Sequence, residues 1–368
     1  MKSNLTSVEI NYLVQELQLL EQAKVDSIYH PEKEELYIVF HVPTLGKKIL
    51  KYFNGSFCFL SKNKRPHEKP SGFCLDLRRH ILNARVNKVT QCESERILKL
   101  ELEKEEKMNL YIELFAKGNV ILTKKDETIL ATLKHNTFKE RVIRPKQPYS
   151  YPTMPINIFK AKEQDIVNIL KKSIKTLVKC LATEIGIGGT YAEEVCKLAD
   201  TPKTKKASEL NKEQASSISK KIKEVLSRSP EPAIITEEDE IIDVVPIPLE
   251  LYKDLEQKPF KTYSGALDTY CSKNLEIREK TPKEKAKEKL ERILKTQKKH
   301  LQQIEIQSKE EQDKGELIYS QYQLLQKLMQ QINDAKQEMT LQEMKKKLKS
   351  HKIIKDLNPR DKTITVEL

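Results

Sequence analysis

Residues 96–134, RILKLELEKEEKMNLYIELFAKGNVILTKKDETILATLK, decide the fold class of the first part of the chain. Apolar and charged residues alternate at the start of this stretch, and three apolar runs follow at 109–115, 119–125 and 128–134. This pattern predicts four successive strands, because neighbouring side chains of a strand point to opposite faces of a sheet. Lys117-Gly118-Asn119 is typical of a turn between two of them.

The residues upstream extend these strands to an α+β domain that ends near Pro152. Residues 6–22 predict a helix with one apolar face, capped by Thr6 or Ser7. Asn54-Gly55 is a strong signal for a β-hairpin. Further strands are predicted at 24–31, 35–42, 47–53 and 56–60, and a second helix at 71–84.

Downstream the chain changes character to helices over 162–227 and then to a strand-rich, Pro-punctuated stretch over 232–275. Residues 276–312 are highly charged and predict a long helix. A weak coiled-coil seam runs along it, with Leu290, Leu294, Gln297, Leu301, Ile304 and Ser308 on alternating three- and four-residue steps. The last residues, TITVEL, predict one strand without a partner, as if the chain were cut from something longer.

Composition limits the function classes. The chain has 368 residues, which is too many for one ordinary core, and a formal net charge of +13, which suits a polyanionic partner. Its six cysteines form no CxxC pair, so we expect reduced thiols in a cytoplasm and neither a zinc site nor a disulfide framework. An apolar run of about 18 residues is absent, so we expect no membrane span.

Two motifs have the residues for contact with an RNA or DNA backbone. Glycines at 186, 188 and 189 interrupt two predicted helices, as in a helix-hairpin-helix, where the amides at a helix start can hold a phosphate. A plain, tightly packed turn is the alternative. Arg78, Arg79 and Arg85 lie on or beside the predicted helix 71–84, and His80 among them is more typical of a surface residue than of a catalytic one.

Glu95-Arg96 precedes a strand and is by default a surface ion pair. In a functional interpretation the arginine meets a phosphate or a terminal ribose while the acid orients it. Lysine runs at 203–206, 220–223 and 345–349 are solvated faces or, as a set, an RNA-backbone surface. The sequence contains no nucleophile–base constellation and no metal-ligand set.

Several segments in order resemble the NFACT family, which includes bacterial RqcH proteins, also called fibronectin-binding protein A-like, and eukaryotic NEMF. The resemblance runs along nearly the whole chain. The family's C-terminal NFACT-R domain has no counterpart in this sequence. It rests on LTSVEINYLVQELQ, GFCLDLRRHILNARV, QCESERILKLEL, YIELFAKGNVILTKKDETILATLK, EIGIGGTYAEEVCKLAD and VVPIPLELY.

The resemblance implies an N-terminal domain folded like that of formamidopyrimidine-DNA glycosylase, over 1–153. It further implies a helix-hairpin-helix domain and a coiled-coil arm with a small middle domain at its tip. The expected boundaries are 154–230 for the hairpin domain, 231–275 for a strand-rich closing segment, 276–313 for the arm and 314–368 for the middle domain.

The resemblance also implies a ribosome-associated quality control factor rather than an enzyme. Members of the family bind the large ribosomal subunit with its stalled peptidyl-tRNA. They recruit aminoacylated tRNA for template-free C-terminal tailing, with alanine in the bacterial case. The expected partners are therefore the large subunit, tRNA and rRNA, without cofactor or metal. A DNA-binding or DNA-glycosylase-like repair protein is the alternative, although the start Met1-Lys2-Ser3 lacks that class's Pro-Glu; a cell-surface adhesin is a third.

The family's site residues transfer with two changes. Its Asp-Arg pair appears as Glu95-Arg96, and an aspartate of its first helix appears as Glu9, so each acid is one methylene longer. The resulting hypothesis is that Arg96 holds a phosphate or sugar near the acceptor end of tRNA. Glu95 would fix the rotamer of Arg96, and Glu9 would present its carboxylate to the same pocket.

Overall fold

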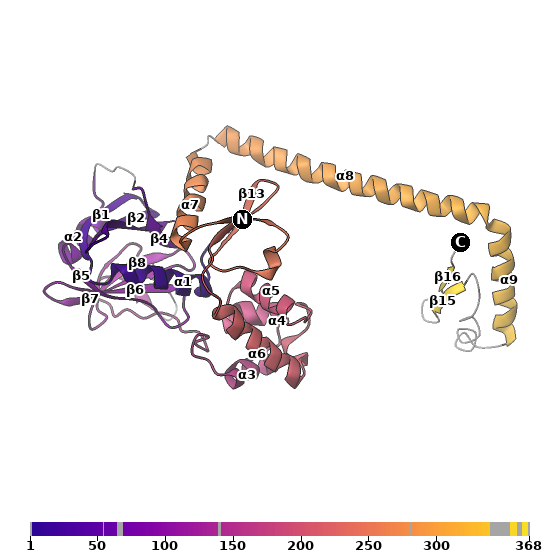
Figure 1. Ribbon diagram of the computed structural model, residues 1–368, viewed down its shortest axis with the longest axis horizontal. Coiled ribbons are helices and arrows are strands. Elements are labelled where there is room, and N and C mark those ends of the chain that lie inside the picture. Colours follow the sequence, from indigo (N-terminus) through magenta and orange to yellow (C-terminus); the bar gives the residue numbers. More distant parts are fainter. Residues whose placement is uncertain are drawn as a thin grey trace. The chain divides into compact units, whose positions relative to one another are not determined.

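The computed structural model describes residues 2–53, 55–64, 69–138, 141–279, 282–338, 354–358 and 363–366. The chain forms two compact units, Met1–Glu276 and Ile277–Leu368 (Figure 1). Helices and antiparallel sheets both contribute to the first unit, which confirms the α+β prediction. No helix in the described ranges combines the length and the hydrophobicity that a bilayer crossing needs.

A nine-stranded antiparallel sheet forms the first half of this unit, in the order β4-β3-β2-β1-β5-β6-β7-β8-β9. Two helices accompany it, α1 (Ser7–Leu17, continued by η1, Gln18–Leu20) and α2 (Gly72–Ile81). The strands are β1 Lys24–Glu32, β2 Glu35–Val42, β3 Gly46–Phe53, β4 Phe57–Ser61, β5 Arg85–Gln91, β6 Ile97–Glu103, β7 Lys107–Glu113, β8 Asn119–Lys124 and β9 Ile129–Thr132. A short ribbon follows, with β10 Asn136–Thr137 and β11 Val142–Ile143.

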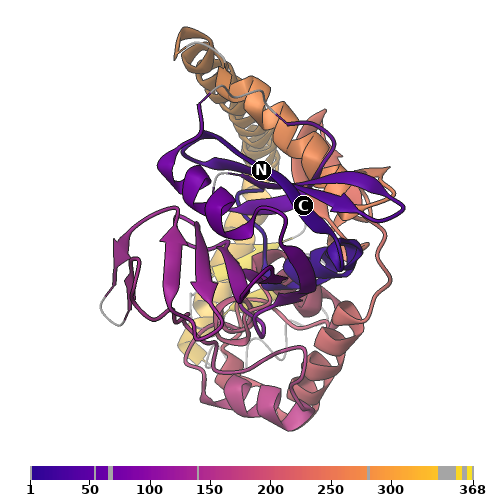
Figure 2. The same cartoon turned by 90° about the vertical axis from the view of Figure 1, so that its left-hand side faces the viewer.

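The sheet curls, so that two hairpin turns from its opposite halves meet. Gly55, after β3, and Gly118, before β8, lie in direct contact, and a Cβ on Gly118 would come within 2.3 Å of the Gly55 backbone. Both residues have positive φ, which only glycine adopts readily. In Figure 2 the indigo strands β1–β4 lie above the purple strands that follow them. The two turn signals of the sequence thus become one contact; Asn54 lies outside the described residues.

A helical part with its own hydrophobic core follows. It contains α3 (Glu163–Lys172), α4 (Leu177–Cys180), the π-helical turn η2 (Leu181–Ile185), α5 (Gly189–Leu198), η3 (Ala207–Glu209) and α6 (Lys212–Leu226). Val8 and Tyr12 of α1 belong to this second core, while Ile10 and Leu13 belong to the core beneath the sheet. Helix α1 therefore packs against both halves of the unit.

The closing segment also joins the two cores. Its elements are β12 (Ala233–Glu237), β13 (Glu240–Val245), η4 (Glu250–Tyr252), β14 (Glu256–Pro259) and α7 (Tyr263–Glu279). Alternate side chains of β12 enter different cores, with Ile234 in the first and Ile235 in the second. This division follows from the two-residue period of a strand.

The second unit contains α8 (Pro282–Ser320), α9 (Tyr322–Glu338), β15 (Ile354–Asn358) and β16 (Thr363–Val366). The predicted boundary at 313/314 falls inside α8, because the helix continues to Ser320. The prediction of an unpaired C-terminal strand was wrong, since β16 pairs antiparallel with β15. Residues 339–353, which contain the lysine run at 345–349, lie outside the described residues.

Candidate functional site

The start of α1 is set by a capping box. The Thr6 hydroxyl accepts a hydrogen bond from the Glu9 amide at 3.3 Å, and Glu9 Oε2 accepts one from the Thr6 amide at 2.8 Å. Each partner satisfies an amide that the helix itself leaves unpaired. The same geometry turns the Glu9 carboxylate back towards the beginning of the chain.

The Glu9 carboxylate lies in a buried ion cluster and is 0% exposed. Lys2 Nζ donates to Glu9 Oε1 at 2.6 Å and to Asp243 Oδ1 at 2.8 Å. The Tyr191 hydroxyl donates to Glu9 Oε1 at 3.3 Å, and the Tyr252 hydroxyl donates to Asp243 Oδ2 at 2.8 Å. The cluster therefore ties the N-terminal segment to α1, β13, α5 and η4.

Burial and charge act against each other in this cluster. Burial raises the pKa of Glu9, the Lys2 ammonium lowers it, and the Asp243 carboxylate raises it again, with a raised pKa as the result. Burial alone lowers the pKa of Lys2, but the two carboxylates outweigh it, so the pKa of Lys2 is raised. The ammonium stays charged, and two acids share one cation.

The expectation that Glu9 presents its carboxylate to a tRNA pocket needs correction. A side chain enclosed by Lys2, Tyr191 and its own capping box does not reach a ligand. The physical reason is the packing of β13 and α5, which brings Lys2 and Tyr191 onto the acid at the first turn of α1. In this structure Glu9 holds elements together.

The turn between β5 and β6 is fastened to the same helix start. The Ser7 hydroxyl donates to the carbonyl of Ser94 at 2.5 Å. Gln91 Nε2 donates to the Ser7 carbonyl at 3.0 Å and to the Glu95 carbonyl at 2.8 Å. Glu95 and Arg96 are thereby placed beside the first turn of α1.

Glu95 and Arg96 are both half-buried, and neither side chain is satisfied. Glu95 Oε1 is buried and accepts no hydrogen bond from the residues that the structure describes. Burial raises the pKa of Glu95, against the backbone amide of Met154, which lowers it. Burial lowers the pKa of Arg96, and the Glu95 carboxylate raises it. Across the described residues the Arg96 guanidinium has no hydrogen-bond or ion-pair partner, so it remains available to an anion.

The glycine turn before α5 also packs against the helix start. Gly186 and Gly188 have φ values of 84° and 85°. A Cβ on Gly188 would lie 2.6 Å from Thr6 Cγ2, and one on Gly186 would lie 2.7 Å from Met154 Cε. The amides of both glycines already donate to carbonyls of η2, at Leu181 and Ala182.

The three glycines of the predicted RNA contact therefore differ in their surroundings. Gly186 and Gly188 serve as packing residues, which is the alternative that the sequence left open. Gly189 is the exposed first residue of α5, and a Cβ there would meet nothing within 4 Å. Because the cap residue Gly188 offers no side-chain acceptor, the first amides of α5 lack a side-chain cap.

The predicted arginines lie elsewhere, on α2 and at the start of β5. Arg78 Nε donates to the carbonyl of Ile28 at 2.9 Å, which anchors α2 to β1. Arg85 Nη1 donates to Gln22 Oε1 at 3.3 Å. Arg79 is exposed. None of the contacts described for them involves Glu95, Arg96 or the glycine turn.

Sequence analysis missed Lys2 and Asp243. Lys2 belongs to no motif, and its partners are 7 and 241 residues away. Asp243 does have a signal, since it is an acid within the apolar run IIDVVPI of a predicted strand. A carboxylate at such a position is expected to find a cation when it is buried.

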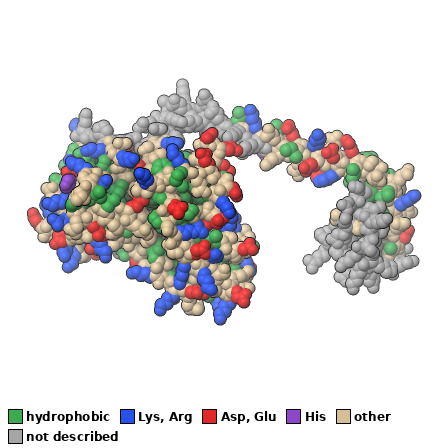
Figure 3. All heavy atoms as spheres, in the orientation of Figure 1, with side chains coloured by type: hydrophobic (Ala, Val, Ile, Leu, Met, Phe, Trp, Pro, Cys, Tyr) green, Lys and Arg blue, Asp and Glu red, His purple; other side chains and the backbone are tan. Residues whose placement is uncertain are grey.

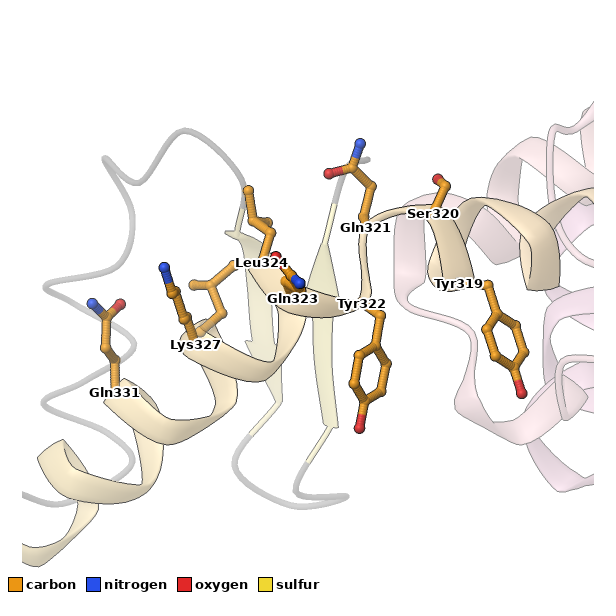
Figure 4. A pocket seen from close by; sticks show the side chains of 9 residues that line it. Tyr319, Ser320, Gln321, Tyr322, Gln323, Leu324, Lys327 and Gln331 are labelled. Atoms are coloured by element: carbon orange, nitrogen blue, oxygen red, sulfur yellow. The ribbon is translucent and has the colours of Figure 1, made fainter.

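The second unit has a pocket of about 930 Å³ where α8 ends and α9 begins. Tyr319 and Tyr322 lie on either side of the break and point to the same side of the chain (Figure 4). Their side chains are 83% and 58% exposed. The described lining also includes Lys327 and several glutamines but no acid or histidine. Over the described ranges, no group of His, Cys, Asp and Glu side chains is arranged to hold a metal ion.

The chain matches the family model described as NFACT N-terminal and middle domains over residues 6–366. It is 30% identical over 373 residues to the archaeal Rqc2 homolog aRqcH of Methanocaldococcus jannaschii, which covers 96% of this chain and 55% of that protein. It is 28% identical over 192 residues to the Rqc2 homolog RqcH of Bacillus subtilis, 46% of this chain and 33% of that protein. The chain thus spans at most about 55% of the length of these two relatives.

Two solved structures are similar in fold. The fibrinogen binding protein of Staphylococcus aureus superimposes with a TM-score of 0.61 at 17% identity, over 72% of this chain and 98% of that one. The N-terminal part of the fibronectin/fibrinogen-binding protein of Streptococcus suis gives 0.60 at 20% identity, over 73% and 100%. At these identities the similarity concerns the fold alone.

Proposed function

Because the chain belongs to the NFACT family, we propose that it acts in ribosome quality control. It binds the large ribosomal subunit with its stalled peptidyl-tRNA. It recruits aminoacylated tRNA for template-free addition of C-terminal residues, alanine in particular. The proposal is supported by the names of its relatives, which are Rqc2 homologs, and by a net charge of +13, which favours RNA.

The tRNA part of the proposal depends on one observation, that the Arg96 guanidinium has no partner among the residues the structure describes. A half-buried guanidinium has lost part of its hydration and gains most from a bidentate anion such as a phosphate. The β5–β6 turn that holds Arg96 is itself fixed to Ser7 of α1, so the cation is held in place before the ligand arrives. Pre-positioning reduces the entropy that binding costs.

Glu95 supports Arg96 in this proposal. Its carboxylate raises the pKa of the neighbouring Arg96 and so favours the charged guanidinium. Glu95 Oε1 is buried and has no donor among the described residues, so the acid acts through Arg96 and not on the ligand directly. Glu9 acts at a distance, by holding the start of α1 on which the turn rests.

The protein in this proposal is a binding factor, and the ribosome forms the peptide bonds. Residues 1–153 carry the Arg96 site, 154–230 form the helix-hairpin-helix domain and 231–275 close the unit. The arm begins near residue 276 and extends to Ser320, the end of α8, with the middle domain after it.

We expect Arg96→Ala to weaken tRNA binding about ten- to a hundredfold, because a charged hydrogen bond contributes about 1.5–3 kcal/mol. Arg144→Ala is the matched control, since Arg144 is exposed and its side chain contacts only Thr137, at 3.4 Å, among the described residues. Arg96→Lys retains the charge but not the planar fork and should bind with intermediate affinity. Filter binding or fluorescence anisotropy, with circular dichroism for folding, measures all four proteins.

Equal affinity of folded Arg96→Ala and Arg144→Ala would contradict the tRNA site. Sedimentation with purified large subunits, compared with retention on naked duplex DNA, tests the wider proposal. A preference for DNA would favour a repair protein instead.

A further inference from the structure

Two segments that are distant in sequence form one surface in the helical part. They are residues 171–179, from the end of α3 through α4, and residues 202–206, before η3. Backbone hydrogen bonds hold them together, and Thr176 and Lys206 form an isolated β-bridge. The bonds join Leu177 N to Lys205 O at 2.7 Å, Val178 N to Lys203 O at 3.2 Å and Ala207 N to Lys175 O at 3.0 Å. We call these two segments the two-loop platform.

The two-loop platform contains seven lysines and no acid. Three of the lysines meet acids from neighbouring elements: Lys175 with Glu184 at 3.2 Å, Lys203 with Glu193 at 3.0 Å and Lys206 with Glu209 at 3.8 Å. The exposed Lys171, Lys172 and Lys179 have no ion-pair partner in the described part of the chain. Figure 3 shows several Lys and Arg side chains over α3 and α6, at the lower edge of the first unit.

An apolar side chain stands among these cations. Ile174 is 89% exposed, the highest value among the large hydrophobic residues that the structure describes. Its backbone is held on both sides, because the Ser173 amide donates to the Ile169 carbonyl at 3.0 Å and the Lys175 amide donates to Ser173 Oγ at 3.2 Å. Isoleucine is thus displayed from a fixed position between lysines.

The two-loop platform is separate from the site at the start of α1. Its first segment ends at Lys179 within α4, whereas the glycine turn follows the end of η2. Six helical residues, 180–185, lie between them, or roughly 9 Å at 1.5 Å per residue. A ligand on the platform therefore adds to the Arg96 site without replacing it.

We propose that the two-loop platform docks on the minor groove of an RNA double helix. The unpaired lysines contact phosphates, and Ile174 rests on the sugar and base edges. The minor groove of A-form RNA is wide and shallow, so short projecting side chains reach its floor. Neither segment contains an aromatic residue, which argues against stacking on single-stranded bases. That the helix belongs to ribosomal RNA rests on the proposed function; binding to an RNA duplex does not.

The test uses the full chain and a 16-base-pair RNA hairpin, with a DNA hairpin of the same sequence for comparison. The triple variant Lys171→Ala/Lys172→Ala/Lys179→Ala should bind the RNA hairpin on the order of tenfold more weakly at 50 mM salt. The slope of log K against log salt should fall by about 2–3, because about 0.7–0.9 is lost per phosphate contact. The matched control Lys33→Ala/Lys104→Ala/Lys125→Ala removes the same charge from exposed turns of the sheet and should bind like the wild type.

A second pair of variants tests the apolar contact. Ile174→Ser should weaken RNA binding several-fold and leave the salt slope unchanged, because no charge is altered. It should also reduce the preference for RNA over DNA. Leu45→Ser, at another exposed apolar position, should have no effect. Melting curves of each variant show whether it is folded.

Three outcomes would overturn the inference: equal binding by the two triple variants, a wild type that prefers the DNA hairpin, or binding to phosphatidylserine vesicles with no affinity for the RNA hairpin. Vesicle binding would indicate a membrane surface instead. Sedimentation with large subunits separates this inference from the proposed function. Hairpin binding that depends on the platform supports the inference even when the chain fails to sediment with subunits.

Discussion

Lys2 belongs to no sequence motif, yet it connects three elements of the first unit. Its ammonium lies between Glu9 and Asp243, and its backbone carbonyl accepts a hydrogen bond from the Tyr270 hydroxyl at 2.5 Å. These partners come from α1, β13 and α7. One buried cation therefore compensates acids from two elements, while the same residue binds a third.

We expect Lys2→Met to destabilise the first unit by about 3–5 kcal/mol, because it leaves two buried carboxylates without a counter-ion. Urea unfolding followed by circular dichroism measures the loss. Lys24→Met, at an exposed position, is the control and should change stability by less than about 0.5 kcal/mol. Adding Asp243→Asn should recover part of the loss; no recovery would mean that Lys2 acts through packing and not through charge.

The raised pKa of Glu9 predicts a pH dependence with a definite sign. The folded state binds the proton more tightly than the unfolded state, whose pKa is near 4.5. The contribution of Glu9 to stability is therefore present below pH 4.5 and is lost as pH rises through the folded pKa. We expect the unfolding free energy of the wild type to fall relative to that of Glu9→Gln as pH rises from 4.5.

Subtracting the two denaturation series removes the titration of the groups that do not interact with Glu9. The opposite slope would show that attraction to Lys2 dominates over burial, so that the pKa of Glu9 is lowered.

At the scale of elements, the glycine turn and the cap of α1 form one joint. Gly188 is the N-cap of α5 and lies against Thr6, the N-cap of α1. Two helices thus begin at the same place, each limiting the space available to the other. Glycine is required at this contact for two reasons, the positive φ and the close approach.

Substitution of neighbouring glycines separates packing from RNA contact. Gly188→Ala should cost about 1–3 kcal/mol, because φ is 85° and the new Cβ would lie 2.6 Å from Thr6 Cγ2. Gly189→Ala should be neutral or slightly stabilising, since its Cβ meets nothing within 4 Å. Thermal unfolding measures both. At temperatures well below its melting temperature, the Gly188→Ala variant should bind RNA as the wild type does. Loss of RNA binding by the folded variant would show that Gly188 contacts the ligand.

At the scale of the whole molecule, α7 is the last element that the first core needs. Glu16 of α1 accepts hydrogen bonds from the amides of Tyr263 and Ser264, and Asp268 Oδ1 accepts one from the Ser61 hydroxyl at 2.8 Å. Tyr263, Ala266, Leu267, Tyr270 and Cys271 are all buried in the core beneath the sheet. The first unit is therefore complete only when α7 is present.

A chain that ends at Glu279 should unfold cooperatively, with the same melting temperature as the first unit has in the full chain. It should bind large ribosomal subunits more weakly than the full chain does. A chain that ends at Thr262 should be strongly destabilised, because each buried large side chain of α7 contributes about 1.5–3 kcal/mol. Differential scanning calorimetry compares the two. Aggregation of the longer truncation would show that residues beyond 279 stabilise the first unit.

Local patterns in the sequence predicted the helices, most strands of the large sheet and a cap for the first helix at Thr6 or Ser7, which the structure forms as a capping box between Thr6 and Glu9. The two cap residues are three positions apart, so their contact depends on backbone geometry alone. The similarity of several sequence segments to the NFACT family predicted the family, and with it Arg96 as a candidate site residue. The alternation of 96–104 likewise predicted β6, because strand periodicity is a property of the chain itself.

Tertiary structure alone decided which of these residues meet. Lys2 and Asp243 are 241 residues apart, and Gly55 contacts Gly118 from another hairpin. Glu9 has the same capping pattern whether its carboxylate faces solvent or an ammonium, and only the packing of β13 and α5 over it encloses the acid. Short-range hydrogen bonds and strand or helix periodicity are determined by residues that are neighbours in the sequence. Burial and charge pairing depend on segments that are distant in the sequence and come together only when the cores form.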